Sequence, residues 1–231
     1  MEIKVLQDIL SANDAIARRN QSRFDKHGIL TINVMSSPGA GKTSLILQTI
    51  NHLKEKVRIA VIEGDVTSTI DADKINKQGV TAVQINTGGG CHLDANMTEN
   101  ALDNLPLDDI DLLLIENVGN LICPAGFVLG EHKRAMLLSL PEGDDKPYKY
   151  PSMFTSANVV LINKIDLLPY LDFNITSFIK AVSGLNPEVK IFQVSTKTGQ
   201  GLEGWFSWLQ AQMKERKSRH GSYANAQNVS S

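Results

Sequence analysis

The feature that most constrains the fold of this chain is a glycine-rich loop at residues 36–43, SSPGAGKT. An apolar run at residues 29–35 precedes the loop and a helical pattern at residues 42–50 follows it. This is the strand, loop and helix context of a Walker A phosphate loop. Glycines leave backbone N–H groups free to point at phosphate oxygens, and the helix N-terminus adds its dipole. The loop therefore predicts a nucleoside triphosphate site.

The side chains of this loop have predictable contacts. Lys42 is expected to reach the β- and γ-phosphates, and Thr43 to bind Mg²⁺. Ser36 stands where the motif usually has its first glycine. The alternative is an ordinary strand-to-helix turn, which the Gly-Lys-Thr ending and its context disfavour. The expected phosphate-side residues are Gly39, Ala40, Gly41, Lys42, Thr43 and Ser44.

Strand and helix patterns alternate along the chain, which predicts an α/β P-loop NTPase fold with a mostly parallel central sheet and helices on both faces. The expected strands are residues 29–35, 57–62, 81–85, 110–115, 157–162 and 189–194, with an extra strand at 136–140. The expected helices are residues 42–50, 72–78, 93–105, 176–182 and 202–217, preceded by an N-terminal helix at 6–16. Asn13 interrupts the apolar stripe of that first helix. Residues 141–151 are expected to form an exposed loop.

Two polar loops at the ends of later strands predict which base is bound. Residues 163–166, NKID, match the Asn-Lys-x-Asp guanine signature of regulatory GTPases. The Asp166 carboxylate can accept hydrogen bonds from N1–H and the exocyclic amine of guanine, a donor pair that adenine lacks. Residues 195–197 are similar to the Ser-Ala-Lys loop that backs the same base, so together the loops predict GTP. The expected base-side residues are Asn163, Lys164, Asp166, Ser195, Thr196 and Lys197.

Acidic residues on the phosphate side indicate hydrolysis of GTP to GDP and phosphate. The sequence ENVG at residues 116–119 stands where many GTPases carry Asp-x-x-Gly, so Gly119 is expected near the γ-phosphate. In the acidic segment at residues 63–73, Asp65 and Asp71 could bind Mg²⁺ or orient the attacking water, although Asp71 could also cap a helix. The expected Mg²⁺ ligands are Thr43, Asp65 and Glu116, and the expected catalytic residues are Lys42, Asp65, Asp71 and Glu116. Turnover is expected to be slow, because no arginine finger or water-positioning glutamine is identifiable.

Composition fits one GTPase domain over residues 1–217, followed by a disordered tail at 218–231 that is rich in Ser, Asn and Ala. With 42% hydrophobic and 21% charged residues, the chain has an ordinary globular composition. A formal net charge of -2 provides no basic field for nucleic acid. No segment reads as a signal peptide or a membrane span. We therefore expect a cytoplasmic protein with no nucleic-acid or membrane partner.

Cys91, His92 and Cys123 form a candidate metal site. The loops that carry them each follow a strand, so they leave the same sheet edge as the phosphate loop. Two thiolates and an imidazole suit Zn²⁺ or Ni²⁺, but three ligands leave a tetrahedral shell incomplete, and two subunits could share the metal. The alternatives are a buried Cys123, an exposed His92 and a merely flexible turn at residues 88–90.

These motifs together resemble one family. The segments SSPGAGKT, EGDV, GGCHLDA, ENVGNLICPA and NKID are similar to those of HypB, the accessory GTPases that insert nickel into hydrogenase, over about residues 6–217. The resemblance implies a GTP-dependent homodimer with Mg²⁺ and with Ni²⁺ or Zn²⁺ on Cys91, His92 and Cys123. It also implies two partners, a HypA-type nickel metallochaperone and the precursor of the large subunit of nickel–iron hydrogenase.

Three other functions stay open at this point. An accessory GTPase of the urease or cobalamin type would share the fold, although the Cys91, His92 and Cys123 arrangement favours the hydrogenase branch. A GTP-binding module with structural zinc would unfold when the metal is removed. A small-molecule kinase would make residues 163–166 a coincidence, and it would yield a phosphorylated acceptor rather than free phosphate.

Overall fold

Seven segments pair side by side in one sheet, in the order β3-β2-β4-β1-β5-β6-β7. The computed structural model describes residues 2–66 and 70–228, with backbone alone for residues 2–9, Ile70 and 221–228. The strands are β1 (Leu30–Ser36), β2 (Ile59–Asp65), β3 (Thr81–Asn86), β4 (Leu112–Glu116), β5 (Lys133–Ser139), β6 (Val159–Asn163) and β7 (Lys190–Gln193). All six pairings between them are parallel, which confirms the predicted fold class.

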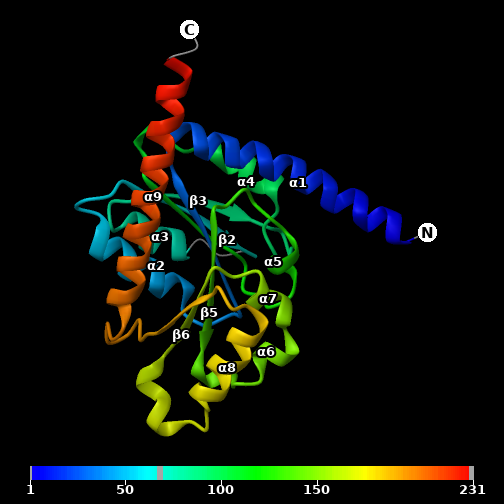
Figure 1. The fold of residues 1–231 in the computed structure, drawn as a ribbon, viewed down its shortest axis with the longest axis vertical. Coiled ribbons are helices and arrows are strands. Elements are labelled where there is room, and N and C mark those ends of the chain that lie inside the picture. The colour runs from blue at the N-terminus through cyan, green and yellow to red at the C-terminus, as the bar shows by residue number, and fades with distance from the viewer. Residues whose placement is uncertain (1, 67–69, 229–231) are drawn as a thin grey trace.

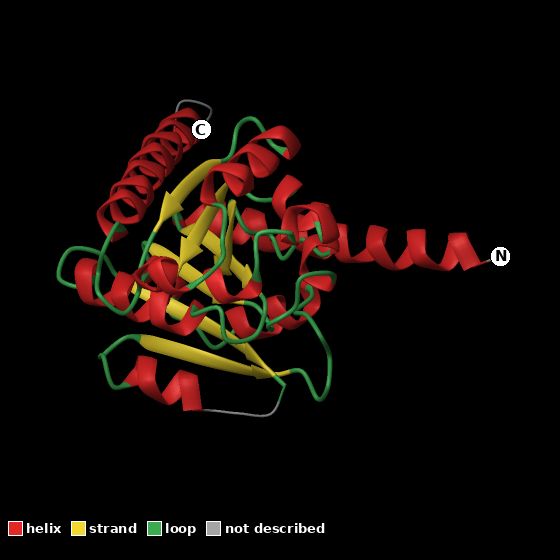
Figure 2. Ribbon diagram, turned by 90° about the horizontal axis from the view of Figure 1, so that it is seen from below, coloured by secondary structure: helices red, strands yellow, loops and turns green. Residues whose placement is uncertain are grey.

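Helices cover both faces of the sheet (Figure 2). One face carries α2 (Lys42–Leu53), α3 (Ile70–Asn76) and α9 (Leu202–Asn228), and the other carries α1 (Glu2–His27), α4 (Ala95–Leu102), α7 (Pro151–Thr155) and α8 (Ile175–Leu185). Shorter helices and turns lie in the connections: η1 (Leu107–Asp109), α5 (Cys123–Gly126), η2 (Leu140–Glu142), α6 (Lys146–Lys149) and η3 (Ile165–Tyr170). Because helices cover both faces, the inner strands are buried and mostly apolar, whereas the edge strands β3 and β7 are more exposed.

The first helix, α1, extends beyond the predicted residues 6–16, and its N-terminal end projects from the body (Figure 1). Asn13, which interrupts the apolar stripe, is buried and bonds to the backbone of two other segments. Its amide donates to Val128 O at 2.9 Å and accepts from Ala95 N at 2.9 Å. A buried amide needs such partners, so this polar residue fixes the packing of α1 rather than weakening it.

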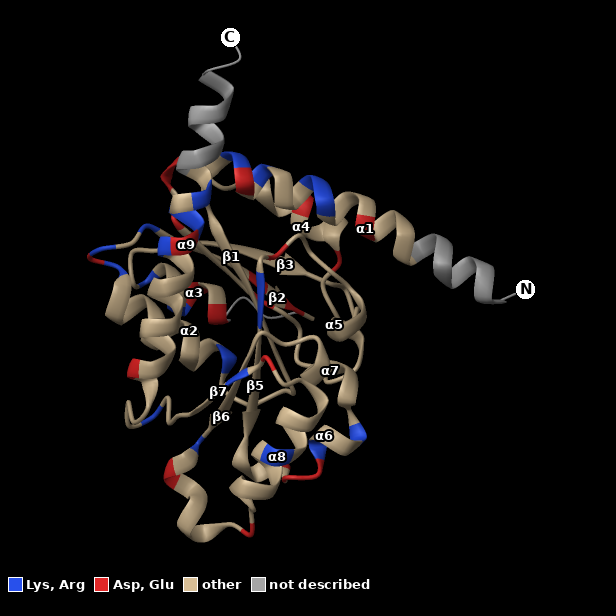
Figure 3. Ribbon diagram, in the orientation of Figure 1, with Lys and Arg blue, Asp and Glu red and all other residues tan. Residues whose placement is uncertain are grey.

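Basic and acidic residues are interspersed along α1 and α9 (Figure 3). Arg19 and Arg23 of α1 form ion pairs with Glu99 and Asp103 at 3.1 and 3.0 Å, and these pairs join α1 to α4 and the turn that follows it. Within the part of the chain that the structure describes, no helix is both long and apolar enough to cross a membrane.

Three segments differ from the sequence prediction. The expected extra strand at residues 136–140 is β5, which lies between β1 and β6 and is integral to the sheet. The expected loop at 141–151 contains helical turns, because Pro141 and Pro147 each stand in a first turn, where a missing N–H costs nothing. The expected tail at 218–231 continues α9 to Asn228, and Arg219 pairs with Glu215 one turn earlier. Residues 229–231 lie outside the described residues.

Candidate functional site

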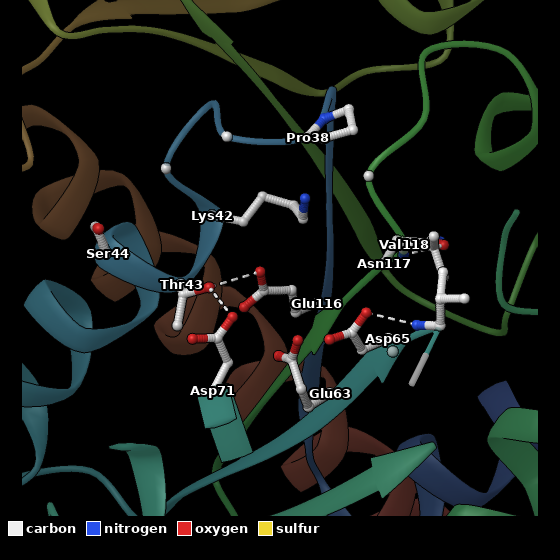
Figure 4. A pocket seen from close by; sticks show the side chains of 15 residues that line it. Pro38, Lys42, Thr43, Ser44, Glu63, Asp65, Asp71, Glu116, Asn117 and Val118 are labelled. Atoms are coloured by element: carbon white, nitrogen blue, oxygen red, sulfur yellow. Dashed lines mark hydrogen bonds between the residues drawn. The ribbon is translucent and has the colours of Figure 1, made fainter. Parts of the chain in front are cut away.

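A pocket of about 480 Å³ opens at the carboxyl edge of the sheet (Figure 4). Its walls come from the phosphate loop, from the ends of β2 and β4, and from Asp71 at the start of α3. The structure brings these predicted residues around one cavity: Gly39, Gly41, Lys42, Thr43, Ser44, Asp65, Asp71, Glu116 and Gly119.

Two glycines allow the phosphate loop to pack closely against its neighbours. Gly41 has a left-handed φ of 107°, and a Cβ there would lie 2.5 Å from Asn163 Nδ2. A Cβ on Gly119 would lie 2.9 Å from Pro38 Cα. The loop therefore touches the base-side segment on one flank and the 116–119 segment on the other, and neither approach tolerates a side chain.

The departure from the motif at Ser36 has a structural role. The buried Lys42 donates from Nζ to Ser36 Oγ at 3.2 Å, and Ser36 Oγ donates to Ser37 O at 2.6 Å. The Ser37 hydroxyl contacts Glu142, which also accepts from Ser139 N at 2.7 Å. The phosphate loop is thereby tied to the end of β5, a contact that sequence analysis did not anticipate.

Carboxylates gather beside Thr43. Thr43 Oγ1 lies 2.9 Å from Glu116 Oε1 and 3.2 Å from Asp71 Oδ2. Glu63 on β2 is in register with Glu116 on β4, and both side chains are nearly fully buried. Within the described chain, Glu63 Oε2 and Glu116 Oε2 have no hydrogen-bond partner.

Burial and repulsion give these carboxyls unusual pKa values. Burial, with repulsion from Glu116, raises the pKa of Glu63 to about 10. Burial also raises the pKa of Glu116, against the opposing charge of Lys42. Buried carboxylate oxygens without partners fit a divalent cation, which prefers oxygen ligands and supplies the missing positive charge.

Sequence analysis did not single out Glu63. It expected Asp65 to bind Mg²⁺, whereas Asp71 is the aspartate that contacts Thr43. Glu63 can be recognised as a site residue only from the register of β2 and β4, which pairs it with Glu116. Asp65 lines the pocket, but its Oδ1 accepts the Val66 backbone N–H at 2.5 Å (Figure 4). Asp71 contacts Thr43 and also pairs with Lys74 at 2.7 Å. Residues 67–69, between the two aspartates, lie outside the described residues.

Glu63 makes the stability of the nucleotide-free, metal-free protein depend on pH. Its pKa is about 10 in the fold against an ordinary 4.5, so between these values the folded state holds a proton that the unfolded chain releases. The free energy of unfolding therefore falls as pH rises through this window, by up to about 1.4 kcal/mol per pH unit. Glu63→Gln is expected to reduce this slope by the part that Glu63 contributes, while the raised pKa of Glu116 leaves the remainder. Urea unfolding across the pH range tests it, and an equal slope in the variant would contradict the assignment.

The base-side loops meet the phosphate loop directly. Asn163 Nδ2 donates to Ala40 O at 2.8 Å, and Asn163 Oδ1 accepts from Thr196 N at 3.0 Å. Lys164 has a left-handed φ of 62°, alone among the non-glycine residues that the structure describes, and its Nζ donates to Gly39 O at 2.8 Å. The left-handed backbone of Lys164 accompanies this contact between its side chain and the phosphate loop.

The predicted base acceptor is already oriented. Ser195 Oγ donates to Asp166 Oδ1 at 2.6 Å and accepts from Thr198 N at 3.1 Å. This fixes the carboxylate of Asp166 just beyond the end of β6. Lys197 is exposed, and its contact with a base stays a prediction.

Cys91, His92 and Cys123 lie together, and their ligand atoms are all within 4.8 Å of one another. The two Sγ atoms are 3.0 Å apart, and Cys91 Sγ is 3.6 Å from His92 Nδ1. The ring of Phe127 lies 4.0 Å from that of His92, between centroids. Burial lowers the pKa of His92, which favours the neutral imidazole that binds metals. The three side chains can therefore offer a site for a thiophilic divalent ion.

The chain is similar to known proteins over most of its length. Residues 30–193 match the family model for the CobW/HypB/UreG nucleotide-binding domain. Hydrogenase maturation factor HypB of Escherichia coli (strain K12) is 48% identical over 212 residues, which cover 92% of this chain and 72% of that protein. A crystal structure of HypB from Helicobacter pylori in complex with nickel has a TM-score of 0.84 and 41% identity, covering 88% of this chain and 96% of the other. HypB from Archaeoglobus fulgidus gives a TM-score of 0.83 and 38% identity, covering 88% and 99%.

Proposed function

The chain belongs to the HypB branch of the CobW/HypB/UreG family, and from that premise we propose that it is a GTP-hydrolysing metallochaperone for nickel insertion into nickel–iron hydrogenase. One observation carries the proposal: the triphosphate pocket and the Cys91, His92 and Cys123 cluster lie at the same edge of the sheet. A single domain over residues 1–217 would then hold both the energy source and the cargo.

The phosphate side supports hydrolysis. Lys42 would neutralise the β- and γ-phosphates, and Gly119 N–H would meet the γ-phosphate. Mg²⁺ would be held by Thr43 and Glu116, with Asp65 at the rim, and it would neutralise developing phosphate charge. Asp71 or Asp65 orients the attacking water. No arginine lines the pocket among the residues described, in keeping with slow turnover without a partner.

The base side supports guanine. Asp166 would accept from N1–H and the 2-amino group, while Asn163 and Lys164 hold the phosphate loop against the base loops. Ser195, Thr196 and Lys197 complete this side. An adenine base would offer the half-buried Asp166 carboxylate no pair of donors, so the site would favour guanine over adenine.

The metal side supports nickel as cargo. Cys91, His92 and Cys123 supply three soft or borderline ligands, which zinc would also accept. A second copy of the chain can supply the remaining ligands across a two-fold axis, which makes the working form a homodimer. By this proposal the protein acts in the cytoplasm with a HypA-type metallochaperone and delivers nickel to the hydrogenase large-subunit precursor.

The two sites are close enough to influence each other. Leu93 follows His92 directly and is fully buried. A Cβ on Gly64, at the end of β2, would lie 2.8 Å from Leu93 side-chain atoms, so this leucine packs tightly on a strand that lines the nucleotide pocket. Movement at the phosphate side would therefore shift the residue that anchors a metal ligand, which couples GTP state to metal affinity and dimerisation.

Product analysis with the full chain tests this function. With Mg²⁺ and GTP we expect GDP and free phosphate, with ATP no turnover, and with Lys42→Ala a loss of about 10²–10³ in rate, as for other removed charge-stabilising donors. Nickel titration should saturate at the Cys91, His92 and Cys123 site. Equal use of ATP, or a phosphorylated acceptor in place of phosphate, would contradict the proposal. Unfolding on chelation would instead identify structural zinc.

A further inference from the structure

A buried polar network begins at the end of β4. Asn117 Oδ1 accepts from Leu93 N at 3.0 Å and from Val118 N at 2.9 Å. Asn117 Nδ2 donates to Asn33 Oδ1 at 3.2 Å, and Asn33 Nδ2 donates to Glu131 Oε1 at 3.3 Å. Asn33 and Asn117 are both fully buried. The network therefore reaches from the segment that contains Glu116 to the loop that carries His92.

The network ends at the loop that carries the other thiol. Arg134 Nε donates to Glu131 Oε1 at 2.6 Å. The two remaining nitrogens of its guanidinium donate to Ala125 O at 3.0 Å and to Phe127 O at 2.9 Å. These carbonyls belong to α5, which begins at Cys123, and to the residue just after it, whose ring lies against His92. One side chain thus holds the backbone of the segment that directly follows Cys123.

The buried ion pair between Arg134 and Glu131 adds little to the free energy of unfolding. The side chains of Glu131 and Arg134 are 2% and 10% exposed, and removing two charges from water offsets most of their attraction. What the pair supplies is geometry, because the rigid fork of arginine can hold two carbonyls at once. Asn33 and Arg134 also occupy paired positions on neighbouring strands, so the sheet itself sets the distance between them.

We propose that Arg134, Glu131, Asn33 and Asn117 are positioning residues of the metal site, and that Arg134 fixes the Cys123 loop while Asn117 fixes the Cys91-His92 loop against the nucleotide-facing end of β4. This inference deepens the proposed function and rests on it for the identity of the metal. None of the four residues belongs to the cluster of candidate metal ligands. They act by holding the two ligand loops at the spacing that a metal needs, as outer partners of metal ligands do.

Arg134→Lys tests the network, because lysine keeps the positive charge beside Glu131 but cannot hold both carbonyls. Asn186→Ala is the matched control: Asn186 Nδ2 donates to three carbonyls at the C-terminal end of α7 and just beyond it, those of Phe154, Thr155 and Ala157, and none of these belongs to a ligand loop. For the full-length, nucleotide-free chain, we expect Arg134→Lys to weaken nickel binding by about 10- to 100-fold with GDP affinity unchanged. Asn186→Ala should leave both affinities at the wild-type value. Asn117→Ala should also weaken nickel binding.

Hydrogen exchange separates this inference from the proposed function. In the metal-free protein, Arg134→Lys should speed amide exchange over residues 123–127, and the control should not. Wild-type nickel affinity and wild-type exchange in Arg134→Lys would overturn the inference. A wild-type protein that binds neither nickel nor zinc would instead overturn the metal assignment of the proposed function. The exchange comparison would still test the network, because it uses the metal-free protein.

Discussion

Replacing Cys123 with serine is expected to weaken nickel binding by more than about 100-fold, since loss of an outer partner of a metal ligand alone costs about 10- to 100-fold. Serine keeps the shape of cysteine, but its hydroxyl stays protonated and is a poor ligand for a borderline metal. The Cys91 and Cys123 sulfurs lie 3.0 Å apart, so one ion can contact both, and the variant removes half of the thiolate set.

Competition against a coloured chelator measures this change in the isolated protein. The nickel–thiolate charge-transfer absorption should weaken in parallel, which reports the loss of a sulfur ligand directly. GDP affinity and the urea midpoint serve as controls, because Cys123 lines no part of the nucleotide pocket within the described residues. Nickel binding at the wild-type affinity in Cys123→Ser would remove this residue from the ligand set.

Asp166→Asn is expected to cost about 2–5 kcal/mol of GDP affinity, the usual loss on truncating a hydrogen-bonded charged partner. That range corresponds to a factor between about 30 and several thousand. The same variant should gain affinity for xanthine nucleotides, because the new amide N–H can donate to the carbonyl that replaces the 2-amino group of guanine. Ser195 Oγ, 2.6 Å from Asp166 Oδ1, can still orient the amide oxygen.

Displacement of a fluorescent guanine nucleotide by GDP and by xanthosine diphosphate measures both halves of this prediction. Asp172→Asn makes the same chemical change at an exposed position six residues along the chain, and it should behave as wild type. A variant at residue 166 that still prefers guanine would show that the NKID segment does not read the base.

Local motifs account for what sequence analysis could predict. The phosphate loop, the NKID loop and the Cys91, His92 and Cys123 set each follow a strand, and parallel strands bring their carboxyl ends to one edge. Their juxtaposition therefore follows from the alternation of strands and helices. The role of Ser36 was hidden, because its hydroxyl contact with Lys42 depends on how the loop closes.

Features that depend on strand register or side-chain packing could not be predicted. Glu63 meets Glu116 only through the pairing of β2 with β4. Asn13 interrupts an apolar stripe in sequence, yet in the fold it binds the backbone of two distant segments. Arg134 precedes the expected extra strand at residues 136–140, and its contacts with carbonyl groups depend on the three-dimensional course of residues 123–127. Sequence periodicity carries none of this information.

We propose that nucleotide and metal bind at the same edge of the sheet, and that binding at one site changes affinity at the other through the residues between them. The direct measurement is nickel affinity of the full-length chain with Mg²⁺ and either GDP or a non-hydrolysable GTP analogue. A coupling free energy of about 1–3 kcal/mol predicts affinities that differ by about 5- to 150-fold between the two states. Equal affinities in both states would contradict the account.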